Sequence, residues 1–157
     1  MKKQGLLLLS ALALLLTVSC AKNPAEPFEG TYDMMAVATS TLEMPTGQHF
    51  PVTDTLRGPI SVTLDEEKGS INVSGLINAT GTVDKEGVLH LDPCSLNTSF
   101  WLPFGWSVDA VLSLKHGDGK LDGDLLKWAA TAGTAYSDNY TFTENNVTFN
   151  GQRRSAE

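Results

Sequence analysis

The three histidines, His49, His90 and His116, are the first candidates for acid–base catalysis and for metal binding. None of them has the spacing of a metal-binding motif, and the chain has no Cys-x-x-Cys pair. On a strand, His90 and Asp92 would lie on one face and could contact a common ligand. Such a pair more often belongs to a solvated polar face. These motifs therefore predict no catalytic residue, no metal ligand and no cofactor.

An acidic run from Asp118 to Asp124 has the composition of a calcium-binding loop. An EF-hand loop requires an oxygen ligand at its third position and a glutamate at its twelfth. Lys120 and Ala129 occupy those two positions here. A hairpin followed by the polar face of a strand explains the run better than a metal site does.

The densest group of possible ligand-binding side chains is aromatic. Phe100, Trp101, Phe104 and Trp106 lie within seven residues, and a proline and a glycine interrupt the run. One interpretation is a hydrophobic plug at the end of the fold, because each ring buries a large area. The other is a platform at the mouth of a barrel, where the rings would stack on sugars or hold a lipid-like molecule. On the second interpretation these four residues form the ligand site.

The elements that would position these side chains are strands. From residue 30 onward the apolar residues recur with a period of two, as where Ile60, Val62 and Leu64 alternate with polar residues. The stretch 124–132 fits either a two-turn helix or a strand, and we favour the strand because its apolar residues also alternate.

Short polar segments that end in glycine separate these runs, at residues 65–69, 84–87 and 116–119. Such segments are typical of hairpin loops. About eight short strands joined in this way predict an all-β fold, either an antiparallel barrel or a sandwich.

Residues 1–19 have the features of a secretory signal peptide. A short basic start precedes an apolar run from Leu6 to Val18. As a helix this run would cover about 20 Å, against about 30 Å for the hydrocarbon core of a bilayer. The run is too short for a permanent transmembrane helix, so we expect an exported protein.

The end of this segment, Leu16–Cys20, resembles a bacterial lipobox. The resemblance implies that Cys20 is acylated, begins the mature protein and anchors it in a membrane. Thr17 stands where such motifs usually carry leucine, and the alternative is ordinary signal cleavage after Ala21. If Cys20 is acylated, residues 20–29, which include two prolines, are the lipidated cysteine and a tether.

Acylation of Cys20 would leave Cys94 as a lone thiol in an oxidising compartment. No cationic residue or histidine can be assigned to activate Cys94, so we expect a small buried side chain.

Two further short signals concern the cell envelope. In some gut bacteria an acidic run after the lipidated cysteine resembles a surface-export signal, and residues 21–25 lack it. This favours an outer-membrane anchor that faces the periplasm. Asp54-Thr55-Leu56 resembles an O-glycosylation triplet of the same bacteria, which makes Thr55 a candidate glycosylation site.

A family resemblance begins at Phe28–Tyr32, where an apolar residue, Gly-Thr and an aromatic ring open the first strand. This opening is similar to that of lipocalin and calycin-like barrels. The hairpin-like stretches at 72–89 and 119–125 extend the likeness, and together they resemble the calycin-like β-barrel lipoproteins of Gram-negative gut bacteria. Tyr32 stands where lipocalins carry tryptophan, so their ligand-binding residues are not transferred to this chain.

The resemblance spans residues 28–152 and implies a fold and a location, but no reaction. It implies a single antiparallel up-and-down β-barrel of the calycin or lipocalin type, with about eight strands, after the signal peptide and tether. The barrel domain would cover residues 30–152 and a short tail residues 153–157.

Composition restricts the function further. The formal net charge of −7 argues against a nucleic-acid partner, which requires a basic surface. We expect a membrane-anchored envelope lipoprotein that is a non-enzymatic binding module for a small apolar molecule, a glycan or a protein partner. The alternative is an envelope hydrolase whose site is assembled from dispersed residues such as His90 and Asp92.

Overall fold

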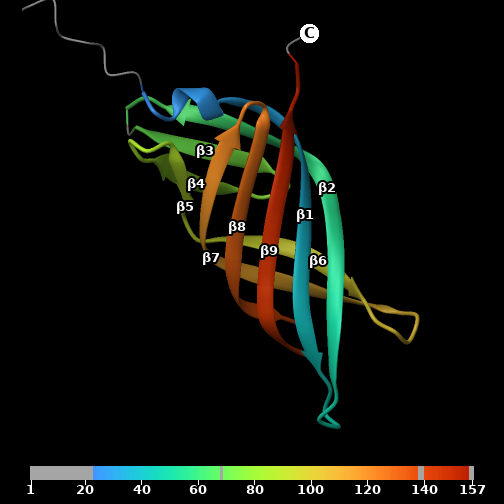
Figure 1. The fold of residues 1–157 in the computed structure, drawn as a ribbon. Coiled ribbons are helices and arrows are strands. Elements are labelled where there is room, and N and C mark those ends of the chain that lie inside the picture. The colour runs from blue at the N-terminus through green and yellow to red at the C-terminus, as the bar shows by residue number, and fades with distance from the viewer. Residues whose placement is uncertain (1–22, 68, 138–139, 156–157) are drawn as a thin grey trace, which may run out of the picture.

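The alternating residues form long antiparallel strands in the computed structural model, which describes residues 23–67, 69–137 and 140–155. In this described part of the chain, nine strands make one sheet (Figure 1). They are β1 (Gly30–Glu43), β2 (His49–Asp65), β3 (Ser70–Gly75), β4 (Ala79–Val83), β5 (Val88–Leu91), β6 (Cys94–Trp101), β7 (Ser107–Asp122), β8 (Leu125–Tyr136) and β9 (Thr141–Arg153). A 3-10 turn, η1 (Glu26–Phe28), precedes β1. The predicted all-β class is confirmed, and the stretch 124–132 lies mostly in strand β8.

The sheet closes into a ring. Its strands follow the order β5-β4-β3-β2-β1-β9-β8-β7-β6, and β5 also pairs with β7. Residues 88–91 of β5 lie opposite residues 117–120 of β7, while β6 pairs with residues 107–114 at the other half of β7. Strand β7 therefore has two successive neighbours on one of its edges. No helix in the described part of the chain is long and apolar enough to cross a membrane.

Two of the three predicted hairpin loops are confirmed, between β2 and β3 and between β4 and β5. The prediction of a loop at residues 116–119 is wrong, because this segment lies inside β7. Its glycines serve packing rather than a turn. A Cβ atom on Gly119 would lie 2.9 Å from the Cβ of Trp128, and one on Gly117 would lie 3.4 Å from the Trp128 ring. The missing side chains make room for Trp128, which stacks on Phe149 with 4.4 Å between ring centroids.

Alternate residues of each strand point into the ring and fill it with side chains. The largest fully buried side chains are those of Tyr32, Phe100, Phe149, Leu42, Ile60, Ile71, Ile77, Leu89, Leu96, Leu112, Leu126 and Val62. The outward residues of the same strands are largely polar, and threonine is frequent among them.

A seam runs between the first half of β2 and β6. Strand β3 pairs only with residues 60–65 of β2, and in the described residues no backbone ladder joins residues 49–59 to β6. A side chain bridges the two strands instead. The Asp54 carboxylate accepts hydrogen bonds from Thr98 Oγ1 at 2.7 Å and from the Ser99 backbone N–H at 3.0 Å.

The residues directly before β1 pack on the ring, within the stretch 20–29 that was predicted to hold the lipidated cysteine and a tether. Phe28 is buried, and the Tyr32 hydroxyl donates a hydrogen bond to the Phe28 carbonyl at 2.8 Å. Arg153, at the end of β9, donates to Tyr32 Oη at 2.7 Å, lies over the Tyr32 ring and also bonds the Pro27 carbonyl. Burial raises the pKa of Tyr32 although the Arg153 guanidinium opposes the shift. The signal peptide and Cys20 lie outside the described residues.

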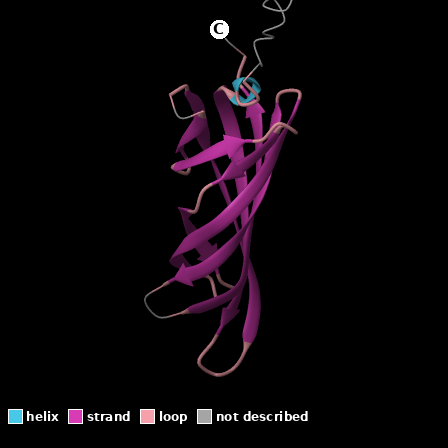
Figure 2. Cartoon of the chain, turned by 90° about the vertical axis from the view of Figure 1, so that its left-hand side faces the viewer, coloured by secondary structure: helices cyan, strands magenta, loops and turns pink. Residues whose placement is uncertain are grey.

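The two ends of the ring differ. Segment η1 and the end of β9 lie at one end, while the β1–β2 turn and the β6–β7 loop lie toward the opposite end (Figures 1 and 2). The aromatic run is therefore distant from the point where the N-terminal residues join the fold.

Candidate functional site

The four aromatic candidates do not act as one group. Phe100 is an inward residue of β6, is fully buried and packs on Phe142 with 5.1 Å between ring centroids. Trp101, Phe104 and Trp106 are exposed, with 67%, 54% and 40% of their surface accessible. Phe100 thus belongs to the core, whereas the other three rings face solvent around the β6–β7 loop.

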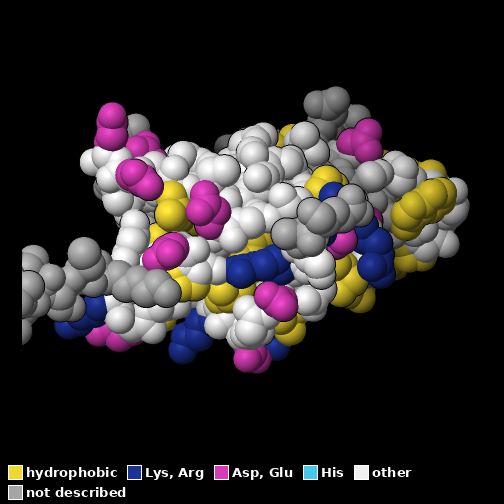
Figure 3. Space-filling model, turned by 90° about the horizontal axis from the view of Figure 1, so that it is seen from above, with side chains coloured by type: hydrophobic (Ala, Val, Ile, Leu, Met, Phe, Trp, Pro, Cys, Tyr) yellow, Lys and Arg dark blue, Asp and Glu magenta, His cyan; other side chains and the backbone are white. Residues whose placement is uncertain are grey.

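The β6–β7 loop is held in a defined turn. The Leu102 N–H donates to the Trp106 carbonyl at 2.9 Å, and the Gly105 N–H donates to the Leu102 carbonyl at 3.1 Å. Gly105 adopts a positive φ of 86°, which favours glycine at this position. Phe104 packs edge-on against Phe50 of β2, with ring centroids 5.5 Å apart. In Figure 3 hydrophobic side chains gather at the right-hand end, the side on which Figure 1 places this loop.

An open hollow of about 1140 Å³ lies beside this loop, and we call it the seam hollow. Its lining comes from both sides of the seam, with Asp54 from β2 and Ser99 from β6. Trp106 and Tyr140 form an aromatic wall, with ring centroids 5.5 Å apart and planes inclined at 52°. Asp109 of β7 also lines the hollow and adds a second carboxylate to it.

The aromatic run is therefore divided between the interior and the surface. Phe100 fills the interior as a plug would, and Trp106 lines the hollow as a platform would. Trp101 and Phe104 do not line the hollow. Tyr140 was not predicted as a site residue, because it is distant from Trp106 in sequence and the two rings come together only in the folded chain.

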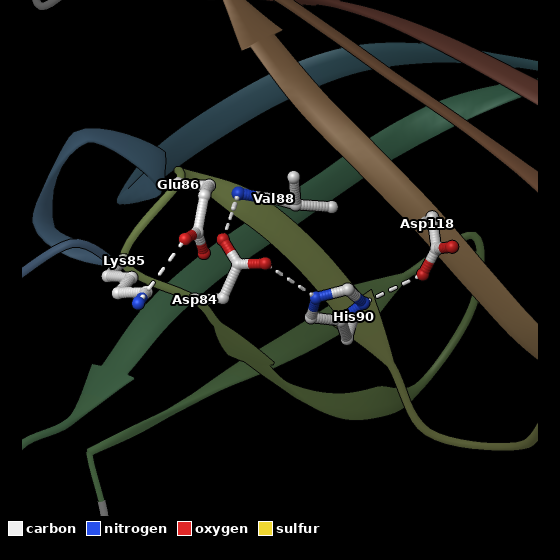
Figure 4. Close-up of polar contacts among 6 residues, drawn as sticks. All are labelled: Asp84, Lys85, Glu86, Val88, His90 and Asp118. Carbon is white, nitrogen blue, oxygen red and sulfur yellow. Dashed lines mark hydrogen bonds and ion pairs between the residues drawn. The ribbon is translucent and has the colours of Figure 1, made fainter.

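His90 belongs to a different cluster from the predicted one. Its Nδ1 lies 2.8 Å from Asp118 Oδ1, and its Nε2 lies 3.0 Å from Asp84 Oδ2 (Figure 4). Asp84 also accepts a hydrogen bond from the Val88 N–H at 2.8 Å. The predicted partner, Asp92, instead accepts a hydrogen bond from the Thr80 hydroxyl.

The two carboxylates change the acid–base properties of this cluster. The carboxylates of Asp84 and Asp118 accept hydrogen bonds from the His90 ring and raise the pKa of His90. The Val88 N–H, and after it the His90 ring, lower the pKa of Asp84. Both ring nitrogens of His90 are engaged, so neither is free to take a proton from a substrate. The cluster crosses the β5–β7 pair and ties together the two strands that close the ring.

Asp118 was missed as a partner of His90 because the two residues are distant in sequence, whereas Asp84 is close in sequence and lies in the turn of the same β4–β5 hairpin. His90 and Asp118 are opposite each other only in the β5–β7 register. Within the described residues, no group of three or more histidine, cysteine, aspartate or glutamate side chains is arranged to hold a metal ion.

The remaining candidates lie apart from one another. His49 is 3.8 Å from Glu43 at the base of the β1–β2 turn, and His116 is exposed on β7. Cys94 is partly buried, and burial raises the pKa of its thiol, which disfavours the reactive thiolate. Thr55 is exposed on the outer face of β2.

No family model matches the chain, and no curated protein matches it. Among solved structures, the chain is similar to the ywiB protein from Bacillus subtilis, with 12% sequence identity. The match covers 80% of this chain and 94% of that one, with a TM-score of 0.33. A likeness this slight supports no argument about fold or function.

Proposed function

We propose that the chain is a lipid-anchored envelope protein that binds a ligand in the seam hollow and has no catalytic role. The observation that supports this function best is the wall of Trp106 and Tyr140 beside an open hollow of about 1140 Å³. Exposed aromatic faces and a few converging polar groups are the usual components of a small-molecule or glycan site. A small apolar molecule, a glycan and a protein partner are the candidate ligands.

The proposal includes a calycin-like β-barrel as the domain type. The ring closed by the β5–β7 pair supports it, as does the order of the strands, in which nearly every strand lies beside the next one in sequence. A closed ring also leaves few strand edges exposed, which suits a protein of the envelope.

The proposed anchor is Cys20 at the end of the lipobox-like segment. Only a few residues separate Cys20 from Ala25, which is buried against the ring. An acyl anchor at Cys20 would thus hold the η1 end of the ring near the outer membrane. The seam hollow, toward the other end, would face the periplasm, where a soluble ligand can reach it.

Binding has more support than the alternative of an envelope hydrolase. That alternative needed a site assembled from residues such as His90 and Asp92, and these two have different partners. The His90 ring is held at both nitrogens by carboxylates on an open face of the sheet. This arrangement suits a link between strands better than proton transfer to a substrate.

Native mass spectrometry of the full-length protein, purified from its own cell envelope, tests the binding function. We expect a retained small molecule or glycan in the wild type and in Trp101→Ala, because Trp101 does not line the hollow. We expect Trp106→Ala to lose it. The proposal is contradicted if the wild type carries no ligand, or if both alanine variants retain it equally.

The anchor is tested separately by cell fractionation. Cys20→Ser should move the protein from the membrane fraction to the soluble fraction, because acylation requires the thiol. Unchanged fractionation would rule out lipidation and leave the binding site to be judged on its own experiment.

A further inference from the structure

The ionisable side chains that line the seam hollow have one sign of charge. Asp54 and Asp109 both line it, and among its described lining residues none is lysine, arginine or histidine. Together with the aromatic wall, this charge points to a ligand class. We propose that the hollow takes an organic cation, either an alkylated ammonium or a guanidinium group; this rests on the proposed binding function.

The two carboxylates meet the hollow from different strands, around Ser99. Asp54 reaches across the seam and accepts the Ser99 N–H at 3.0 Å. Asp109 lies directly opposite Ser99 in the β6–β7 register. Asp54 is fixed by its bonds to Ser99 and Thr98, whereas Asp109 is exposed and has no ion-pair partner among the described residues. Asp109 is thus free to pair with a charge from a ligand.

The aromatic wall favours the same class of ligand. The rings of Trp106 and Tyr140 are inclined at 52°, so their faces form a corner instead of a flat surface. The face of an indole or phenol ring attracts a cation through its quadrupole. Alkylated ammonium and guanidinium groups have little hydration to lose and pack well against such faces.

Other ligands leave some of these groups without a role. A purely apolar molecule would cover two carboxylates without compensating for their lost hydration. An anion would be repelled by both. A neutral sugar could stack on the aromatic wall and donate hydroxyl hydrogen bonds to the carboxylates, but it carries no charge to compensate theirs. A cation uses both the rings and the carboxylates.

Matched pairs of probes isolate the effect of charge in a calorimetric titration of the full-length protein. Choline is compared with 3,3-dimethylbutan-1-ol, which has the same shape without the charge. N-acetylarginine amide is compared with N-acetylcitrulline amide, which tests whether the cation belongs to a peptide side chain. The charged member of at least one pair should bind about 5- to 30-fold more tightly than its neutral partner. Added salt should reduce this preference.

Two aspartate variants test which carboxylate causes the preference for the charged probe. Asp109→Asn should abolish most of the preference for the charged probe. Asp122→Asn removes the same charge from an exposed position at the far end of β7 and should leave the preference intact. Trp106→Ala should weaken binding of both members of the pair.

The outcomes separate this inference from the proposed function. Equal affinity for charged and neutral probes, or an equal effect of the two aspartate variants, overturns the cation proposal. If no probe binds but native mass spectrometry shows a ligand that depends on Trp106, the cation proposal fails and the binding function stands. If no ligand is found by either method, both proposals fail.

Discussion

Phe100 and Trp101 are neighbours in sequence, and the structure predicts opposite effects for their replacement by alanine. Phe100 is fully buried against Phe142, and Trp101 is 67% exposed. Phe100→Ala would remove a buried ring and leave a cavity, whereas Trp101→Ala would remove a ring that water already surrounds.

The magnitudes follow from burial. A buried phenylalanine replaced by alanine costs about 3–5 kcal/mol of unfolding free energy. An exposed position away from special features changes it by about 0.5 kcal/mol or less. With a urea m-value of about 1.5 kcal/mol/M, the unfolding midpoint should fall by about 2–3 M for Phe100→Ala and by about 0.3 M or less for Trp101→Ala.

Urea unfolding followed by far-UV circular dichroism measures both midpoints. If Phe100→Ala is too unstable to purify, Phe100→Leu keeps most of the apolar volume and should lower the midpoint by about 1 M. Equal shifts for the two alanine variants would refute the assignment of Phe100 to the core and of Trp101 to the surface.

Two further predictions concern links that hold the ring. Because the folded pKa of His90 is raised, its stabilising effect is present below about pH 6.5 and is lost as the pH rises through the folded value. His90→Gln should therefore lower the urea midpoint more at about pH 5.5 than at about pH 8.5, and an equal loss at both would contradict the ionic link. Tyr32→Phe removes the hydroxyl that joins Phe28 to Arg153 and should cost about 1–3 kcal/mol in the same assay. An unchanged midpoint would show that the hydroxyl is not needed to hold the segment before β1.

Local patterns predicted most of the strands. Period-two alternation identified the all-β class, and the polar segments at 65–69 and 84–87 marked turns between strands. The alternation at 124–132 correctly favoured a strand over a helix. These successes share a cause, because each depends on residues close together in sequence.

The incorrect predictions concern residues whose contacts in the fold are with residues distant in sequence. Gly117 and Gly119 suggested a turn, but they accommodate Trp128 from a neighbouring strand. His90 finds Asp118 only through the β5–β7 pair that closes the ring. The division between Phe100 and Trp101 could have been expected, because alternation through β6 places Leu96 and Phe100 on one face.

Among the described residues, the seam also leaves two strand edges without a backbone partner. Such edges can pair with other chains and cause aggregation. Pro59 directs its carbonyl to the Leu76 N–H, so its nitrogen faces the same edge of β2. By the two-residue period of the strand, Pro51 faces that edge too. Neither nitrogen carries a hydrogen, so neither can donate to an added strand. On the opposite edge, Asp54 already occupies the Ser99 N–H. Asp54, which also lines the seam hollow, therefore removes one backbone donor from the edge of β6 to which a second molecule could add a strand.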